Sequence, residues 1–296
     1  MTGISIIIPT LNRTAFLKNT LDDLLLQQFE HSYEILVVDQ SAQPDEIILK
    51  HVEGKPLVRY CHITEFRGLP EARNYGAQKA KYDLLVFVDD DIACTFDFIQ
   101  EHWDSYTINS DILIVAGGIT EKNNINKGNR IGFFNSKKAE PVSGFHKEGS
   151  MEVDHAKGCN FSTIKAAYLT HSGIDENLTK GAALYEELDY CLRIRKSGGK
   201  IWFNSKAHVY HLAADTGGCR VSDIDKYLYN LIRNRSLIIE RHLSSKDKRT
   251  AKMELFRLVL AHAVSYKKLS LIRHFFKAGK EGKMAGKLPA KMTKYD

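Results

Sequence analysis

The sequence feature that most constrains the fold is the segment at residues 84–91, which reads LLVFVDDD. Five consecutive apolar residues predict a strand buried on both faces, as in a parallel α/β sheet. Three aspartates follow at its carboxyl end, where such sheets bind ligands. Adjacent carboxylates repel one another, so they need solvent, hydrogen bonds or a cation to offset the repulsion. Hard oxygen ligands on a short loop suit Mg²⁺ or Mn²⁺, and a solvated acidic turn is the simpler alternative.

Strand and helix patterns alternate before this segment. Apolar runs predict strands at residues 4–8, 34–38 and 57–61, and helices are expected at residues 16–25, 47–52 and 70–80. Pro70 suits the first turn of its helix because the N–H that proline lacks has no intrahelical partner there. The alternation predicts a mostly parallel sheet with right-handed crossovers.

Loops after successive parallel strands emerge at one edge of a sheet, so their polar residues are expected to share a crevice. The residues in these loops are Pro9, Thr10, Arg13, Asp39, Asp89, Asp90 and Asp91. Asp39 can accept hydrogen bonds from a base or ribose, and Arg13 and Arg73 can offset phosphate charge. A turn residue and a helix-surface charge are the alternatives for Asp39 and Arg73. The absence of GxGxxG after the first strand, and of GxxxxGK[ST] anywhere, counts against a dinucleotide fold and a P-loop.

Four motifs in order, PTLNR, VVDQS, GLPEARNYG and VDDDI, resemble those of family 2 glycosyltransferases, which are inverting enzymes with a GT-A fold. The resemblance covers roughly the first 95 residues. It implies a Rossmann-like, mostly parallel sheet flanked by helices. It also implies that Asp39 reads the nucleoside and that Asp89 lies near the ribose. Asp91, with Asp90 as a second candidate, would ligate Mn²⁺ or Mg²⁺ on the diphosphate of the sugar nucleotide.

Two glutamates begin a predicted helix in the second half of the chain. Glu186 and Glu187 lie in its first turn, where the helix dipole and free N–H groups favour carboxylates, and an ordinary helix start is the alternative. The run to Asp189 resembles the Glu-Asp-x-Asp pattern of the family and places the catalytic base on Glu187. Because Glu replaces the commoner Asp, Glu186 stays a second candidate. A base that deprotonates the acceptor hydroxyl contributes roughly 10²–10⁴-fold to the rate.

The segments on either side of this helix supply the remaining candidates. His211 follows predicted strands at residues 200–203 and 207–210, and its imidazole would favour Mn²⁺, although a lone histidine is often structural. The resemblance implies a metal-binding histidine at this point. Arg220 ends a loop with paired glycines that could close over a diphosphate or form a flexible turn. Residues 120–150 are expected to form loops over the crevice. The resemblance implies that the glycine-containing turn at residues 158–162 lies under the donor sugar.

Charge is distributed unevenly along the chain. Residues 246–296 contain 14 Lys/Arg and 4 Asp/Glu, a net charge of +10, so residues 1–245 carry −4 within the total of +6. Helical patterns at residues 224–243 and 253–276 would pack on the protein core or lie on an anionic membrane surface. A nucleic-acid-binding core is not expected. Without a membrane-spanning run or a signal peptide, a cytoplasmic location is expected, with peripheral contact to the inner face of the membrane as the alternative.

Together with these residues, the resemblance implies a metal-dependent inverting glycosyltransferase. The expected donor is a nucleoside-diphosphate sugar, with UDP-sugars favoured, and the expected acceptor is a saccharide or lipid-linked saccharide in cell-surface polysaccharide synthesis. Residues 1–118 would bind the donor, residues 119–215 would form the acceptor half of the same domain, and residues 216–296 a helical extension. The alternatives are a catalytically silent sugar-nucleotide-binding protein and a haloacid-dehalogenase-type phosphatase, whose aspartate loop normally follows the first strand of its domain.

Overall fold

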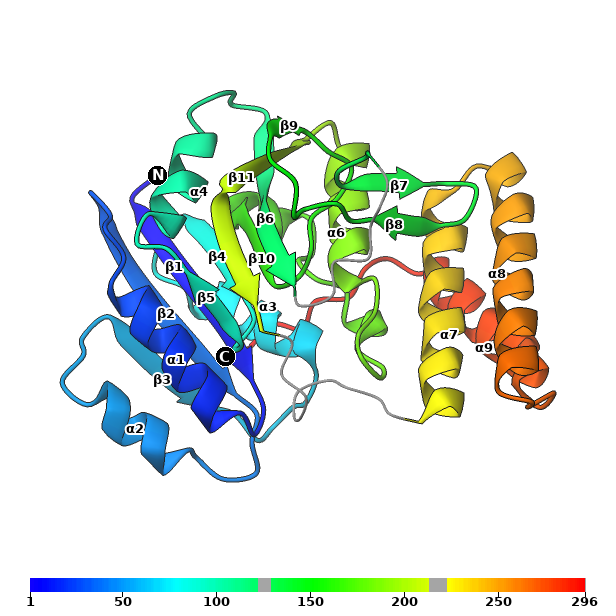
Figure 1. Ribbon diagram of the computed structural model, residues 1–296, viewed down its shortest axis with the longest axis horizontal. Helices are drawn as coiled ribbons and strands as arrows, with labels where there is room; N and C mark the ends of the chain where they lie inside the picture. The colour runs from blue at the N-terminus through cyan, green and yellow to red at the C-terminus, as the bar shows by residue number, and fades with distance from the viewer. Residues whose placement is uncertain (122–128, 213–222, 296) are drawn as a thin grey trace.

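A computed structural model describes residues 1–121, 129–212 and 223–295, and its centre is a mixed β-sheet (Figure 1). The sheet strands are β1 (Gly3–Thr10), β2 (Ser32–Asp39), β3 (Val58–His62), β4 (Leu84–Val88), β5 (Ile92–Cys94), β6 (Ile112–Glu121), β9 (Ser150–Glu152), β10 (Asn160–Ile164) and β11 (Lys200–His211). Among the described residues their order is β3-β2-β1-β4-β10-β6-β11-β5, and β9 pairs with β11.

Most strands of this sheet run in one direction. β3, β2, β1 and β4 are parallel to one another, and β6 and β11 are parallel to each other. β10 is antiparallel to both β4 and β6, so these two groups share a direction. The shorter β5 and β9 pair with β11 in the opposite sense. The predicted α/β class with a mostly parallel sheet is therefore confirmed.

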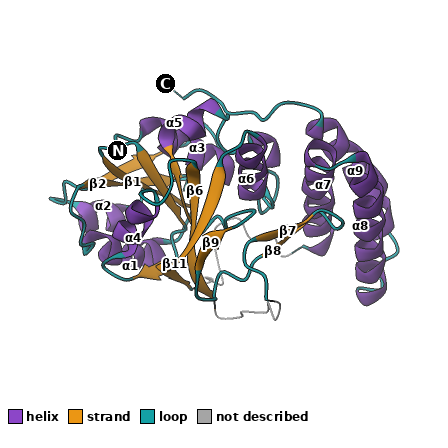
Figure 2. Cartoon of the chain, turned by 90° about the horizontal axis from the view of Figure 1, so that it is seen from above, coloured by secondary structure: helices purple, strands orange, loops and turns teal. Residues whose placement is uncertain are grey.

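Helices cover both faces of the sheet. They are α1 (Thr14–Leu25), α2 (Glu46–Val52), α3 (Leu69–Lys79), α4 (Phe98–Ser105), α5 (Lys165–Thr170) and α6 (Glu186–Lys196). Figure 2 shows α3, α5 and α6 on one face and α1, α2 and α4 on the other. All five residues of β4 are fully buried between these layers, as their uninterrupted apolar sequence predicts.

Close packing of α3 on the sheet depends on one glycine. A Cβ atom at Gly76 would lie 2.5 Å from Cγ2 of Ile7 in β1. The absence of a side chain therefore lets the helix approach β1, and this positions the loop before α3 at the carboxyl edge of the sheet.

The carboxyl-terminal helices form a bundle beside the sheet (Figure 1). They are α7 (Ile224–His242), α8 (Ser245–Ser265) and α9 (Leu271–Gly286). Leu188 and Leu192 of α6 belong to the same hydrophobic core as Leu228 and Ile232 of α7, so the bundle packs on the domain through α6. No described helix is both long and apolar enough to span a bilayer. The functional division at residue 118 and the limits of the extension stay predictions.

After α9 the chain returns to the other side of the molecule, where Figures 1 and 2 both show it near α3. The hydroxyl of Thr293 donates a 2.5 Å hydrogen bond to Glu176 in the 3₁₀ turn Glu176–Leu178. The ring of Tyr295 lies 4.6 Å from Phe66 and 5.8 Å from Tyr75, between centroids. These contacts hold the chain segment that precedes α3.

Several predicted elements differ from the structure. Residues 160–164 form the antiparallel strand β10, and the predicted strands at 200–203 and 207–210 are one strand, β11, with a register shift between Asn204 and His208. The expected loops at 120–150 include the hairpin β7 (Phe133–Asn135) and β8 (Glu140–Val142). The single helical pattern at 253–276 is divided between α8 and α9, where Lys267 has a positive φ of 53°.

Candidate active site

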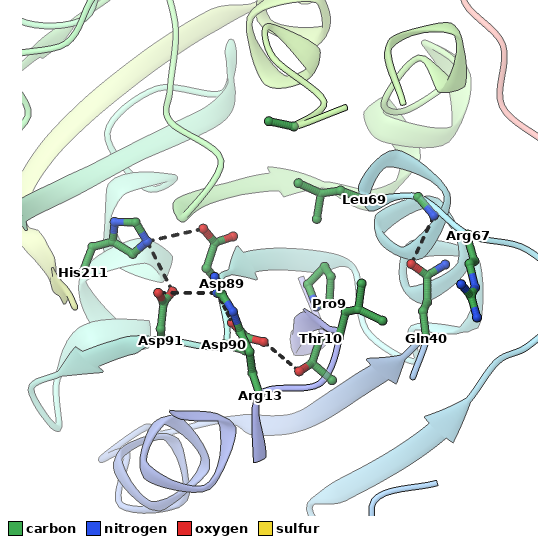
Figure 3. A pocket seen from close by; sticks show the side chains of 13 residues that line it. Pro9, Thr10, Arg13, Gln40, Arg67, Leu69, Asp89, Asp90, Asp91 and His211 are labelled. Carbon is green, nitrogen blue, oxygen red and sulfur yellow. Dashed lines mark hydrogen bonds and ion pairs between the residues drawn. The ribbon is translucent and has the colours of Figure 1, made fainter. Parts of the chain in front are cut away.

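A cavity of about 330 Å³, here called the first cavity, lies at the carboxyl ends of β1, β2 and β4 (Figure 3). The residues that line it are Pro9, Thr10, Leu11, Arg13, Gln40, Arg67, Gly68, Leu69, Asp89, Asp90, Asp91, Ala182 and His211. Seven of the predicted site residues are in this set. The structure thus brings together the loops after β1 and β4 and the end of β11.

Asp90 holds the loop after β1 in place. The hydroxyl of Thr10 donates to Asp90 Oδ2 at 2.7 Å, and Arg13 Nη1 donates to Asp90 Oδ1 at 2.8 Å. Burial raises the pKa of Asp90 to about 6, although the contacts with Thr10 and Arg13 act in the opposite direction. Arg13 is thereby oriented toward the aspartates and also lies 3.5 Å from Asp91 Oδ2.

His211 lies among three carboxylates. Its Nε2 is 3.2 Å from Asp91 Oδ1 and 3.6 Å from Asp89 Oδ2, while Nδ1 is 2.8 Å from Glu121 Oε1. Burial by itself lowers the pKa of His211, but the hydrogen bonds to Asp91 and Glu121 outweigh burial and raise it to about 10. The hydrogen bond from Nδ1 to Glu121 fixes the ring so that Nε2 faces Asp89 and Asp91 (Figure 3).

These groups fit a divalent metal ion. Carboxylate oxygens and one imidazole nitrogen are a donor set that suits Mn²⁺, and the oxygens alone suit Mg²⁺. Ligand atoms of Asp89, His211 and Cys159 all lie within 4.8 Å of one another. Burial raises the pKa of the Cys159 thiol well above its ordinary value, which keeps the sulfur protonated. Asp89, Asp91 and His211 are therefore the better candidate ligands.

Asp39 lies beneath the first cavity and does not line it. This residue ends β2 and is 1% exposed. Its Oδ1 accepts hydrogen bonds from the backbone N–H and hydroxyl of Ser41 at 2.8 and 2.5 Å, and its Oδ2 accepts one from the hydroxyl of Tyr60. The next residue, Gln40, reaches the cavity wall instead.

Arg73 connects the first cavity with α6. Its side chain is 1% exposed, and Nη2 is 3.2 Å from Asp89 Oδ1 and 2.8 Å from the carbonyl oxygen of Gly158. Nη1 forms an ion pair with Glu186, which is 2% exposed. Arg73 therefore does not line the cavity, and its charge is balanced by protein carboxylates. Glu186 is engaged in the same buried ion pair.

Glu187 faces a second cavity, of about 250 Å³. The residues that line this second cavity are Glu140, Pro141, Ser143, Phe145, His155, Ala156, Lys157, Leu184, Tyr185, Glu187, Leu188, Tyr227 and Leu231. Glu187 is partly exposed, whereas its neighbour Glu186 is buried. The two candidate bases thus differ in environment, and only Glu187 is open to a ligand.

A strained loop and a chain of ion pairs join the two cavities. Gly181, Ala183 and Tyr185 have positive φ angles of 67°, 48° and 71°. Ala182 lines the first cavity, while Leu184 and Tyr185 line the second, so residues 181–185 lie between them.

Lys157, in the wall of the second cavity, provides the other connection. Its Nζ is 2.6 Å from Glu121 Oε1, and the same oxygen is bonded to His211 in the first cavity. Glu121 thus links a side chain of one cavity to a candidate metal ligand of the other.

Some site residues were not predicted from the sequence. Gln40 lies inside the motif VVDQS and Arg67 directly precedes the motif GLPEARNYG, and these positions were the available signal. Glu121 and Lys157 have no comparable sequence signal, because Glu121 and its partner His211 are 90 residues apart. The predicted Arg220 lies outside the described residues.

Comparisons of the sequence with known proteins agree with this geometry. The family model described as Glycosyl transferase family 2 matches residues 5–165. Hyaluronan synthase of Pasteurella multocida is 37% identical over 117 residues, which are 38% of this chain and 12% of that protein. Chondroitin synthase of Escherichia coli is 28% identical over 116 residues, 38% of this chain and 17% of the synthase. The chain therefore spans only a small part of these two relatives.

A longer match exists with the glucosyl-dolichyl phosphate glucuronosyltransferase of Haloferax volcanii. It is 25% identical over 221 residues, 70% of this chain and 68% of that protein.

Two solved structures share the fold. S. aureus TarS 1-349 in complex with UDP-GlcNAc has a TM-score of 0.66 at 17% identity, over 96% of this chain and 81% of that chain. The mannosyltransferase PcManGT from Pyrobaculum calidifontis, in complex with GDP-Man and Mn²⁺, has a TM-score of 0.58 at 12% identity. The match covers 96% of this chain and 84% of that chain. These likenesses support the GT-A architecture.

Proposed function

The chain belongs to glycosyl transferase family 2, and from this premise we propose that it transfers a sugar from a nucleoside-diphosphate sugar to a hydroxyl group, with inversion at the anomeric carbon. One observation carries the proposal. The cavity with Asp89, Asp91, His211 and Arg13 lies on one side of residues 181–185, and Glu187 lies in the cavity on the other side. A donor and an acceptor could therefore meet at this loop.

The first cavity suits a nucleoside diphosphate. Arg13 is the cation closest to the aspartates, and Arg67 lies in the wall beside Gln40. Pro9, Thr10 and Asp89 would lie against the nucleoside, and Asp39 would act from below through the loop it holds. Asp90 keeps Arg13 oriented, Arg73 holds Asp89, and Arg220 would approach the diphosphate from its loop. UDP-sugars are the favoured donors.

Asp91 and His211, assisted by Asp89, would hold Mn²⁺ or Mg²⁺. When bound, such an ion neutralises the charge that develops on the diphosphate leaving group. The fixed hydrogen bond from His211 to Glu121 keeps the imidazole in one orientation toward the aspartates.

Glu187 would act as the general base. Its carboxylate accepts the proton of the acceptor hydroxyl while the acceptor oxygen bonds to the anomeric carbon and the bond from that carbon to the diphosphate oxygen breaks. Because one displacement completes the reaction, no covalent enzyme intermediate forms. Glu186 is the poorer candidate because its carboxylate is paired with Arg73.

We further propose that the acceptor is a saccharide or lipid-linked saccharide used in cell-surface polysaccharide synthesis, and that the enzyme binds the cytoplasmic surface of an anionic membrane. The bundle carries exposed apolar side chains at Val264, Leu269 and Phe276, which are 75%, 74% and 65% exposed. Lys267 and Lys277 are exposed among them. Exposed apolar groups with adjacent cations are the composition that binds anionic lipid surfaces.

Product formation tests this proposal directly. The purified protein with MnCl₂ should convert a UDP-sugar and a soluble oligosaccharide to UDP and an elongated oligosaccharide, and EDTA should stop the reaction. The product should carry the anomeric configuration opposite to that of the donor. If no member of a UDP-, GDP-, dTDP- and CMP-sugar panel yields an elongated product on a broad acceptor panel, the proposed activity is wrong.

A further inference from the structure

Four segments of the chain form the walls of the second cavity. Glu140 to Phe145 come from β8 and the loop after it, and His155 to Lys157 come from the loop before β10. The loop before α6 and the start of α6 form the third wall. Tyr227 and Leu231 of α7 form the fourth. The last two walls lie beyond the matched family segment, which ends at residue 165.

Part of the lining of the second cavity is apolar and aromatic. It consists of Tyr185, Tyr227, Leu184 and Leu231, and the first two side chains are half-buried. Burial raises the pKa of Tyr185 to about 12, so its phenol group keeps its proton and can donate a hydrogen bond. Aromatic side chains of this kind offer a flat apolar surface with a polar tip.

Other lining residues supply hydrogen-bonding groups. They are Glu187, Ser143, Lys157 and His155, of which His155 is 3% exposed. Nδ1 of His155 lies 2.9 Å from the carbonyl oxygen of Ala156, and Nε2 makes no hydrogen bond to any described residue. Burial lowers the pKa of His155, which favours the neutral ring. A neutral imidazole presents a group that can pair with a ligand hydroxyl.

The charge of the second cavity disfavours an anionic ligand. Glu140 and Glu187 contribute two carboxylates, and Lys157 is the basic side chain in its lining. The charge of Lys157 is balanced by Glu121 at 2.6 Å and that of Glu140 by Arg235 at 3.8 Å, so the carboxylate of Glu187 decides the charge that a ligand meets. A phosphate group would therefore meet net negative charge there, whereas an uncharged polyhydroxylated ring would not.

From these observations we propose that the second cavity binds an uncharged sugar ring at the end of a saccharide acceptor, and that Tyr227 of α7 is a specificity-determining residue for this ring. The inference rests on the proposed function and deepens it. The C–H face of the ring packs on Tyr185 and Tyr227, and its hydroxyls reach Ser143, His155 and Glu187. The carboxyl-terminal helices thus take part in choosing the acceptor, besides packing on α6.

The experiment measures acceptor use and donor binding separately in the parental protein, Tyr227→Ala and Tyr227→Phe. Acceptors are p-nitrophenyl glycosides of uncharged sugars, with glycerol phosphate as the anionic probe, and donor binding is read from the thermal shift with UDP and Mn²⁺. Tyr227→Ala should raise the acceptor KM about tenfold or more, since the stacked ring face is lost. Tyr227→Phe should keep a KM near the parental value, and neither substitution should alter the UDP shift.

Tyr266→Ala, at the exposed end of α8, is the matched control and should leave the KM unchanged. An unchanged KM in Tyr227→Ala overturns the inference, and so does preference for glycerol phosphate over every glycoside. In both cases transfer by the parental protein still supports the proposed activity. Absence of any transfer by the parental protein would instead refute the proposed activity.

Saturation-transfer NMR with the same glycosides in the presence of UDP then tests the cavity independently of turnover, and loss of the signal in Tyr227→Ala is the supporting result.

Discussion

Acidic side chains gather in two regions of the molecule, at the first cavity and at the junction between α6 and the carboxyl-terminal helices. At the junction, Asp189 is fully buried, with Oδ1 2.9 Å from Arg241 and 2.8 Å from His242, and Oδ2 2.8 Å from Arg193. Arg241 also lies 2.7 Å from Asp175. At the first cavity, Asp89 and Asp91 also lie near cations, namely His211, Arg73 and Arg13, but both carboxylates line an open cavity.

The difference between the two regions lies in the access that their carboxylates have to a ligand. Burial alone would raise the pKa of Asp189, but Arg193, His242 and Arg241 outweigh burial and hold it well below its usual range. A carboxylate surrounded by cations in this way stabilises the fold and has no capacity left for a ligand. In the first cavity, by contrast, Asp89 and Asp91 line open space, so their oxygens can reach a cation that enters with its ligand.

The largest effect is expected at Glu187, the carboxylate of α6 that lines the second cavity. Glu187→Gln removes the proton acceptor with little change in shape, so kcat should fall roughly 10²–10⁴-fold while UDP binding is retained. The matched variant Glu186→Gln disturbs the buried pair with Arg73. It should lower the melting temperature more than Glu187→Gln does, and it should lower kcat less. Initial rates with a UDP-sugar and circular dichroism melts measure both quantities. The assignment fails if the two variants show the reverse pattern.

Replacement of the buried Asp189, in the same first turn of α6, should lower stability. Asp189→Asn leaves Arg241 and Arg193 buried with less negative charge around them, and the free energy of unfolding should fall by about 3–5 kcal/mol. Urea denaturation followed by fluorescence measures this change. Asp111→Asn, at an exposed position, is the control and should be neutral. A neutral Asp189→Asn would mean that the junction does not depend on these ion pairs.

A third prediction concerns His102, a histidine that is buried away from both acidic regions. His102 is fully buried between the hydroxyl of Ser162 and the side-chain oxygen of Asn160, both at 2.9 Å, and burial lowers its pKa to about 4. Between pH 6.5 and 4 the unfolded chain binds a proton that the folded chain excludes, so stability should fall by up to about 3 kcal/mol. His102→Gln should remove this part of the pH dependence in urea melts. An unchanged slope would contradict the buried neutral state.

The smallest expected effect concerns the surface of the bundle, away from both acidic regions. Each cation near an anionic bilayer contributes about 1 kcal/mol, so replacing Lys277 and Lys280 by Gln should weaken vesicle binding roughly 30-fold. Co-sedimentation with phosphatidylserine-containing vesicles measures this, and binding should decline with salt. The control replaces Lys50 and Lys137, outside the bundle, and should bind like the parental protein. Equal binding by both variants would contradict the membrane surface.

The first half of the fold could be predicted because its signals are local. The apolar run at Leu84–Val88 and the proline at position 70 define a strand and a helix start without reference to distant residues. β10 was missed because Asn160, Ser162 and Thr163 look like turn residues, yet all three are fully buried. Distant side chains satisfy them, such as His102 for Asn160 and Ser162, and these partners are not visible in the local sequence.

Prediction of the site residues from the sequence was limited in the same way. Asp89, Asp91 and His211 could be placed at one cavity because each ends a predicted strand. The environments of Glu186 and Glu187 could not be separated, because the pairing of Glu186 with Arg73 joins residues 113 positions apart in the chain. The sequence identified carboxylates, and only tertiary structure shows which of them are already neutralised.

The central claim is that the open carboxylates and His211 bind a nucleoside diphosphate together with a divalent ion, and the most direct test is the thermal shift of the parental protein and Asp91→Asn with UDP. For the parental protein, UDP with Mn²⁺ at 100-fold excess over Kd should raise Tm by about 5 °C, and UDP with EDTA should raise it much less. Asp91→Asn should lose the Mn²⁺-dependent part. Equal shifts with and without Mn²⁺, or an undiminished shift in Asp91→Asn, would contradict the claim.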